Sequence, residues 1–149
     1  MKKKELLFRA CMDVLEQKIA IAKDGMQAAQ DSANNETKSS AGDKYETGRA
    51  MSQNERDMYA KQLAELQHQY KMLKSIDPKK KLDRIETGAW VTTESAEFFI
   101  SIGLGLVKWE LQSIMAISPV SPIAQQLLGK GEGDSYSWMN KDFKILKVQ

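Results

Sequence analysis

The chain has little of several residue types on which specialised folds and sites depend. Its 149 residues include one cysteine, one histidine and three prolines. The single cysteine, Cys11, cannot form an intramolecular disulfide, and the repeated Cys/His spacing of a zinc site is missing. These absences exclude a disulfide-stapled domain and a zinc module, and a cytoplasmic location fits them.

Long apolar runs and an excess of one charge are also missing. The net charge is +2, from 22 basic and 20 acidic residues, so no strong overall field attracts nucleic acid or an anionic membrane. The apolar window "FFISIGLGLV" is shorter than the roughly 20 residues that span a bilayer. At the start, Glu5, Arg9 and Asp13 interrupt what would be the apolar run of a signal peptide. We therefore expect a soluble protein without a signal peptide.

Residues 1–75 have the composition of helices. They contain no proline and are rich in Lys, Glu, Gln, Ala, Leu and Met, which are good helix formers. Apolar residues recur at spacings of three and four in two segments. These residues are Leu7, Cys11, Leu15, Ile19, Ala22, Met26 and Ala29, and then Tyr59, Leu63, Leu66, Tyr70 and Leu73. Each segment is thus predicted to be a helix with one apolar stripe.

The segment "DSANNETKSSAGD" separates the two helices with residues that favour turns. The simplest arrangement is an antiparallel helical hairpin that turns near residues 34–42. From Gln27 to Arg49 the only non-polar side chains are alanines and Tyr45, so we expect the tip to project into solvent. A helix of about 28 residues is roughly 40 Å long, which exceeds the width of a small domain.

The second half reads as a small α+β domain. Pro78 and a basic run mark residues 76–87 as a linker. In residues 88–149, "AWVTTES", "EFFISIG" and "ELQSIMAIS" are strand-like, and "SYSWMNKDFKILKV" predicts a hairpin with Asn140-Lys141 at the bend. Ser121, Pro122 and Gly129 are the expected N-cap, first residue and stop of a short helix. We predict an antiparallel sheet with this one helix against it.

The C-terminal segment "ISPVSPIAQQLLGKGEGDSYSW" resembles the signature of the bacterial Gre family of transcript-cleavage factors (GreA and GreB). That signature is a Ser-Pro-(Ile/Leu)-x-x-x-Leu-(Ile/Leu)-Gly-Lys stretch leading into Gly-Asp and a strand. The matching positions are Ser121, Pro122, Ile123, Leu127, Leu128, Gly129, Lys130, Gly133 and Asp134. Near the hairpin turn, "GDKYETG" is similar to the family's Gly-Asp-x-x-Glu-Asn-Ala tip, with Gly42, Asp43 and Glu46 at the same spacing.

The resemblance covers nearly the whole chain and implies an architecture, a partner and a role. The architecture is an N-terminal coiled-coil hairpin followed by an FKBP-like domain. The partner is RNA polymerase, whose secondary channel the hairpin enters. There Asp43 and Glu46 would help to hold a second Mg²⁺ and orient the water that cuts backtracked RNA. The docking residues would be Ser121, Pro122, Ile123, Gly129 and Lys130, and the nascent RNA 3′ end would be reached indirectly.

The tip pair is chemically suited to that role, although it is no enzyme alone. Mg²⁺ takes oxygen ligands and is often bound through one or two carboxylates. Residues three apart on a helix have Cβ atoms about 5–6 Å apart, so Asp43 and Glu46 can converge on one cation. Two metals about 4 Å apart would stabilise the attacking and leaving oxygens of a phosphodiester. The chain would stimulate the intrinsic nuclease of the polymerase as a monomer, and would bind Mg²⁺ only within that complex.

Other interpretations of the same residues remain open. Asp-x-x-Glu before a helix is also a variant of the capping box, and both roles are compatible. Thr47, Gly48 and Arg49 replace the family's continuation after the glutamate, and Arg49 is placed to pair with Glu46. These departures favour an alternative function, a non-catalytic regulator that occupies the channel without stimulating cleavage. An independent prolyl isomerase or chaperone is a weaker alternative, because no active-site constellation is visible.

Three further features have plain structural interpretations. Cys11 lies on the apolar stripe, which argues against a thiol–imidazole site with His68. The basic run of residues 79–81 is expected to be a solvated linker, with an RNA or polymerase contact as the alternative. Trp90, Trp109 and Trp138 occur in strand-like contexts and are expected to be mainly core residues.

Overall fold

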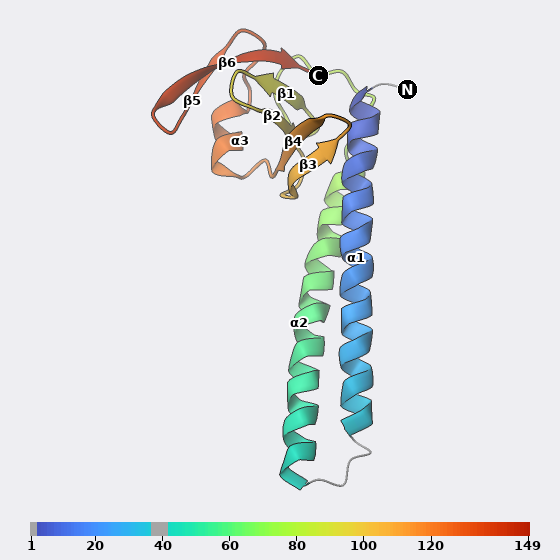
Figure 1. Ribbon diagram of the computed structural model, residues 1–149. Helices are drawn as coiled ribbons and strands as arrows, with labels where there is room; N and C mark the ends of the chain where they lie inside the picture. The colour runs from blue at the N-terminus through green and yellow to red at the C-terminus, as the bar shows by residue number, and fades with distance from the viewer. Residues whose placement is uncertain (1–2, 37–41) are drawn as a thin grey trace. The chain divides into compact units, whose positions relative to one another are not determined.

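The computed structural model describes residues 3–36 and 42–149, and for residue 36 and residues 42–46 it describes the backbone only. The chain begins with two long helices and continues with strands and one short helix (Figure 1). The elements are α1 (Lys3–Glu36), α2 (Gly42–Lys74), β1 (Trp90–Thr93), β2 (Glu97–Ile100), β3 (Gly105–Trp109), β4 (Gln112–Ile117), α3 (Pro122–Leu127), β5 (Ser135–Trp138) and β6 (Lys141–Val148). The α+β class predicted from the sequence is confirmed.

The chain divides into two compact units, one of residues Val14–Tyr70 and one of Met1–Asp13 with Lys71–Gln149. Among the described residues, no helix is both long and apolar enough to cross a membrane. The predicted turn near residues 34–42 falls mainly on residues 37–41, which lie outside the described residues, as does the expected exposure of the tip side chains.

The unit Val14–Tyr70 is a pair of helices in contact along their apolar stripes. On α1, Leu15, Ala22 and Ala29 are buried at intervals of seven, and on α2 Leu63 and Leu66 are buried. This burial confirms the stripes predicted from the sequence and matches the seam of a coiled coil.

The Tyr59 ring of α2 lies against Gly25 of α1. A Cβ atom built on Gly25 would lie 2.6 Å from Cε1 of Tyr59, so the Tyr59 ring occupies the space that any larger residue would need. Towards Glu36 the buried side chains of α1 are alanines, Ala29 and Ala33, which allow close helix contact but bury little apolar area.

The other unit is built around a six-stranded sheet with the order β3-β4-β2-β1-β6-β5. Its core contains Leu82, Ile85, Ala89, Val91, Phe98, Ile100, Ile117, Ala124, Leu127, Tyr136 and Ile145. The segment of residues 76–87, expected to be a linker, contributes Leu82 and Ile85 to this core. The N–H of Ile85 donates to the carbonyl of Lys130 at 2.8 Å, and the N–H of Gly129 donates to the carbonyl of Ile85 at 2.8 Å. This segment is therefore folded against the turn after α3.

The sheet is mixed, so the prediction of a purely antiparallel sheet was wrong. β4 pairs in parallel with β2, with Phe98 opposite Met115 and Ile100 opposite Ile117. The strand β3, absent from the prediction, forms the outer edge, and β4 returns between β3 and β2. Burial explains the order, because only one of the five residues of β3 is buried whereas three of the six residues of β4 are buried and a fourth is half-buried. The more apolar strand takes the inner position.

The predicted C-terminal hairpin is present, but its bend lies one residue earlier than expected. Trp138 pairs with Lys141, so the bend is Met139-Asn140 and not Asn140-Lys141. Both bend residues have positive φ, 52° and 63°, as a two-residue type I′ turn requires. Asn tolerates this conformation and Met does not favour it, which is why composition placed the bend wrongly.

Candidate functional site

The two acidic residues of the hairpin lie within the first five residues of α2. This helix begins at Gly42, so Asp43 and Glu46 are its second and fifth residues. Their spacing of three puts them on one face of the helix, and the partial positive charge of a helix N-terminus stabilises carboxylates there. The positions of the two carboxylates themselves lie outside the described side chains.

These two residues fit a shared Mg²⁺ site and not a complete one. Mg²⁺ demands near-octahedral coordination, and two carboxylates supply only part of it. Among the side chains that the structure describes, no group of three or more His, Cys, Asp or Glu residues is arranged to hold a metal ion. Asp43 and Glu46 would therefore need oxygen ligands from a partner or from water.

The second group of predicted site residues starts at α3. Ser121 is the N-cap of this helix, and Pro122 is its first residue. The Ser121 hydroxyl donates to the carbonyl of Ser118 at 2.7 Å and accepts from the N–H of Ala124 at 3.4 Å. Pro122 is exposed and Ile123 is half-buried against the core. The Ser-Pro pair thus starts the helix, as predicted, and leaves one face of the proline accessible.

The turn after α3 depends on Gly129 and Lys130. Gly129 has a φ of +83°, which glycine adopts without strain, and it ends the helix as predicted. The ammonium group of Lys130 donates to the carbonyl of Ser135 at 2.9 Å. Lys130 therefore connects the end of α3 to the start of β5, and its charge stays at the surface because the side chain is only half-buried.

The Gly-Asp pair before β5 also closes a turn. The Asp134 carboxylate accepts from the N–H of Gly131 at 2.8 Å and lies 3.3 Å from the Arg84 guanidinium. Gly133 has a φ of +89°, and its N–H donates to the carbonyl of Ile145 at 2.8 Å. Each polar residue of the signature thus has a role in shaping this segment, whether or not it also contacts a partner.

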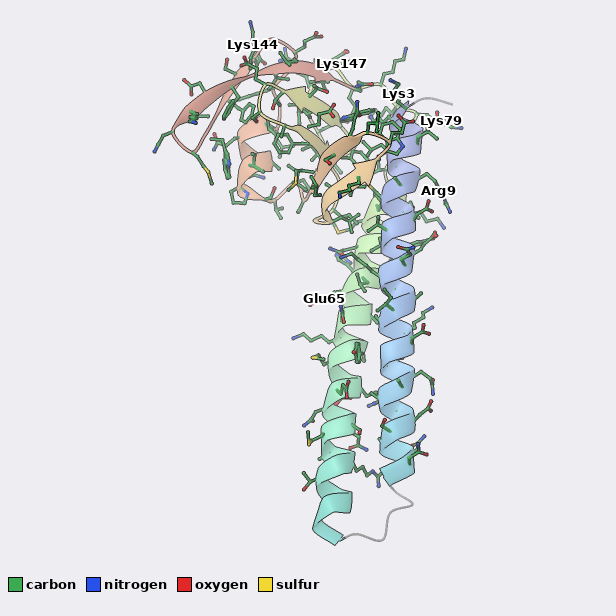
Figure 2. All side chains as sticks on the ribbon, in the orientation of Figure 1. Lys3, Arg9, Glu65, Lys79, Lys144 and Lys147 are labelled. Atoms are coloured by element: carbon green, nitrogen blue, oxygen red, sulfur yellow. The ribbon has the colours of Figure 1, made fainter. Side chains whose placement is uncertain are left out.

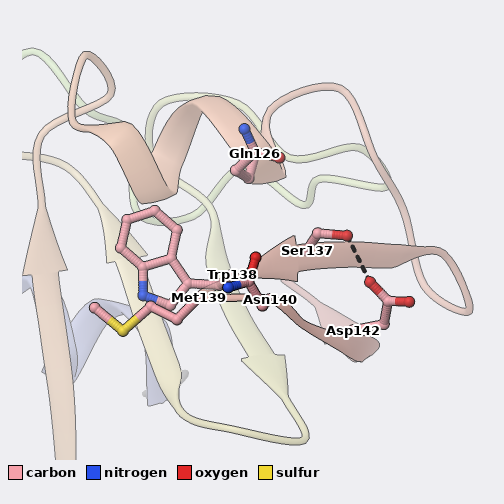
Figure 3. Close-up of a pocket in the computed structure, with 6 residues that line it drawn as sticks. All are labelled: Gln126, Ser137, Trp138, Met139, Asn140 and Asp142. Carbon is pink, nitrogen blue, oxygen red and sulfur yellow. Dashed lines mark hydrogen bonds between the residues drawn. The ribbon is translucent and has the colours of Figure 1, made fainter.

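A pocket beside α3 was not anticipated from the sequence. Its volume is about 400 Å³, and Figure 3 shows residues of α3, β5 and the β5–β6 bend around it. The lining residues are Gln126, Ser137, Trp138, Met139, Asn140 and Asp142. The Ser137 hydroxyl donates to Asp142 at 2.5 Å, and the Met139 side chain is 79% exposed. Trp138 is half-buried at this pocket, whereas Trp90 is a core residue that meets the half-buried Trp109 edge to face at 5.7 Å.

An exposed methionine at a strained bend marks this pocket in the structure. Met139 takes a positive φ that long side chains disfavour, and its side chain is nevertheless presented to solvent. The pocket shares α3 with the predicted docking segment, so the two form one continuous candidate surface. We call Ser121–Lys130 together with the pocket the α3 surface.

The thiol of Cys11 is unsuited to catalysis. Cys11 is fully buried, and burial raises its pKa from 9.0 to about 12. The thiolate, which is the reactive form, is therefore scarce at neutral pH. Cys11 acts as a small core residue of its unit, while His68 is exposed on α2.

Comparisons with known proteins leave the family of this chain unassigned. No protein-family model matches the chain, and no curated protein sequence matches it. One similar solved structure is that of the transcription factor Gfh1, with 18% identical residues over 92% of each chain and a TM-score of 0.36. A TM-score of this size does not establish a common fold.

Proposed function

We propose that this protein is a transcription factor of the Gre type that binds RNA polymerase, inserts its helical hairpin into the secondary channel, and stimulates Mg²⁺-dependent cleavage of backtracked RNA. The observation that carries the proposal is the start of α2 at Gly42, which puts Asp43 and Glu46 one helical turn apart within the first five residues of a 33-residue helix. At about 1.5 Å per residue this helix is roughly 50 Å long. A narrow rod of that length is suited to carrying a charge into a channel.

The chain's own residues have three tasks in this proposal. The buried stripe of α1 and α2 keeps the two helices together, so that the hairpin enters as one body. Asp43 and Glu46 supply two carboxylates to a Mg²⁺ that the polymerase also binds; when bound, this metal would generate the attacking hydroxide and stabilise charge on the phosphodiester. The FKBP-like domain docks on the channel rim through the α3 surface, with Ser121, Pro122, Ile123, Gly129 and Lys130 as contacts.

The proposed role needs a partner for catalysis. Two carboxylates near the start of a helix form no substrate pocket. The chain would therefore supply metal ligands to the active site of the polymerase instead of acting as an enzyme itself. A cytoplasmic location follows from this role, because the polymerase works there.

A second function, channel occupancy without cleavage, is favoured by the residues that follow Glu46. Gly48 lies within α2, where glycine costs about 1 kcal/mol relative to alanine, and Arg49 is three residues from Glu46. A helix weakened at Gly48 and a nearby cation both reduce the ability of Glu46 to bind a metal.

The test is RNA cleavage in a stalled, backtracked complex of the source organism's polymerase. We expect added protein and Mg²⁺ to shorten the transcript, and Asp43→Asn/Glu46→Gln to lower cleavage to the level of polymerase alone while binding persists. The matched control is Glu55→Gln/Glu65→Gln, which removes two exposed acids further along α2 and should leave cleavage unchanged (Glu65 in Figure 2). Binding without cleavage by the unmodified protein would establish the second function, and absence of binding would refute both.

A further inference from the structure

A lysine-lined pocket lies in the unit of residues 1–13 and 71–149, and it shares no lining residue with the α3 surface. Its volume is about 600 Å³, and six of the residues that line it are lysines. They are Lys3, Lys4, Lys79, Lys80, Lys81 and Lys147. Figure 2 shows three of them, Lys3, Lys79 and Lys147, near the start of α1 and the end of β6. Three segments distant in the sequence therefore bring their cations to one concave surface.

The charge of this pocket differs from that of the chain as a whole. Asp83 is the one acidic side chain among its lining residues, so the lining carries a formal excess of five positive charges. The whole chain has a net charge of only +2. Like charges gathered in a concavity repel one another, and the concave shape focuses their field on whatever enters. A bound anion would reduce this repulsion.

Lys4 is the buried floor of this pocket. Its side chain is 6% exposed, and its ammonium group donates to the carbonyl oxygens of Lys80 at 3.0 Å and Gln149 at 3.1 Å. An ammonium group has three N–H donors, so one remains for a ligand. Burial lowers the pKa of Lys4, an effect that Lys80 reinforces and that Asp77 and Glu86 oppose. A bound anion would favour the charged ammonium group, whose hydration burial has reduced.

Most of the other lysines are available to a ligand. Lys80 lies 3.5 Å from Glu86, which neutralises part of its charge. Within the described part of the chain, the ammonium groups of Lys3, Lys79, Lys81 and Lys147 make no ion pair. Lysine binds phosphate as a mobile point charge, so a group of lysines suits several adjacent phosphates better than one planar carboxylate.

We propose that this pocket binds a small anion with two or more linked phosphate groups, and that a nucleoside polyphosphate is the class it fits. The volume is within the range of about 300–1,000 Å³ typical of small-molecule sites. Pro78, Leu82 and Val148 also line the pocket and provide an apolar wall for a base. A nucleic-acid backbone would need no such wall. This proposal is independent of the proposed function, because binding requires no polymerase.

The test is isothermal titration calorimetry of the full chain with inorganic tripolyphosphate, with ATP, and with a short single-stranded RNA. The pocket variant is Lys79→Gln/Lys81→Gln. Its matched control is Lys108→Gln/Lys144→Gln, which removes the same charge from exposed strand residues outside the pocket. Lys4→Met tests the floor, and circular dichroism checks that each variant is folded. If Lys4→Met does not fold, the exposed pair Lys79 and Lys81 decides the question.

We expect saturable binding of one tripolyphosphate or ATP per chain, weakened about tenfold by Lys79→Gln/Lys81→Gln and by raised salt, and unchanged in the control. Tighter binding of ATP than of tripolyphosphate would support use of the apolar wall. Equal weakening in the pocket variant and the control would overturn the proposal in favour of diffuse attraction. Binding of RNA without binding of tripolyphosphate or ATP would overturn it in favour of a nucleic-acid surface, and no saturable binding of any of the three would also overturn it.

Discussion

Gly25 contacts the Tyr59 ring, and this contact leads to a prediction about Gly25→Ala. The substitution should lower the free energy of unfolding when position 59 is Tyr and raise it when position 59 is Ala. Glycine inside a helix costs about 1 kcal/mol relative to alanine, so Gly25→Ala should by propensity stabilise α1 by that amount. In the folded hairpin, however, the new methyl carbon would lie 2.6, 2.7 and 2.9 Å from three atoms of the Tyr59 ring. Carbon atoms prefer separations of about 3.5–4.0 Å, so the ring must move by about 1 Å.

The two effects can be compared in magnitude. Overpacking of this kind costs about 1–3 kcal/mol, which exceeds the gain in propensity. Gly25→Ala should therefore lower the free energy of unfolding by about 1 kcal/mol in the natural chain. With Tyr59→Ala in place, the obstruction is gone and the same change should raise the free energy of unfolding by about 1 kcal/mol. The coupling energy between the two positions is then about 2 kcal/mol.

The measurement is urea unfolding of the four chains of this double-mutant cycle, followed by circular dichroism at the helical signal. A matched comparison is Gly48→Ala, a glycine in α2 whose substitution should stabilise the helix by about 1 kcal/mol in either background. A stabilising effect of Gly25→Ala in the natural chain, or a coupling energy near zero, would refute the packing argument. The close approach of the two helices at Gly25 would then have no energetic role.

Two further predictions concern buried groups in the other unit. Tyr136→Phe removes a hydroxyl that is hydrogen-bonded to Thr93 at 2.9 Å and to Ser95 at 2.6 Å, so thermal unfolding should show a loss of about 1–3 kcal/mol. An unchanged midpoint would mean that these bonds contribute nothing net. Cys11, whose pKa burial raises to about 12, should react with a disulfide reagent at pH 8 about three orders of magnitude more slowly in the folded chain than after unfolding in urea. Similar rates in both states would contradict the burial of this thiol.

Several elements could be predicted from the sequence, because they depend on interactions between neighbouring residues. The stripes of α1 and α2 follow from a spacing of three and four, which puts apolar residues on one helical face wherever the helix packs. The start of α3 at Ser121-Pro122 and its end at Gly129 follow from a hydroxyl cap, a fixed proline φ and a left-handed glycine. Such features depend on a few adjacent residues, so distant parts of the chain cannot easily override them.

The order of the strands in the sheet could not be predicted from the sequence. β3 escaped prediction because an edge strand needs only one buried side chain, Val107, and its neighbours are exposed or only half-buried. The parallel pairing of β2 and β4 depends on which strand gains more from the inner position, and this comparison involves the whole core. A pattern within one segment contains no such comparison.

The candidate sites also differ in whether neighbouring residues or tertiary contacts determine them. By itself the sequence determined the helical stripes, the caps of α3 and the spacing of Asp43 and Glu46, because each is a relation between neighbours along the chain. Only the tertiary structure decided that Gly25 lies against the Tyr59 ring, that Met139 borders a pocket, and that lysines from residues 3–4, 79–81 and 147 share one surface. The physical reason is that these groups are far apart in sequence, and burial of the apolar core, which has no direction of its own, brings them together.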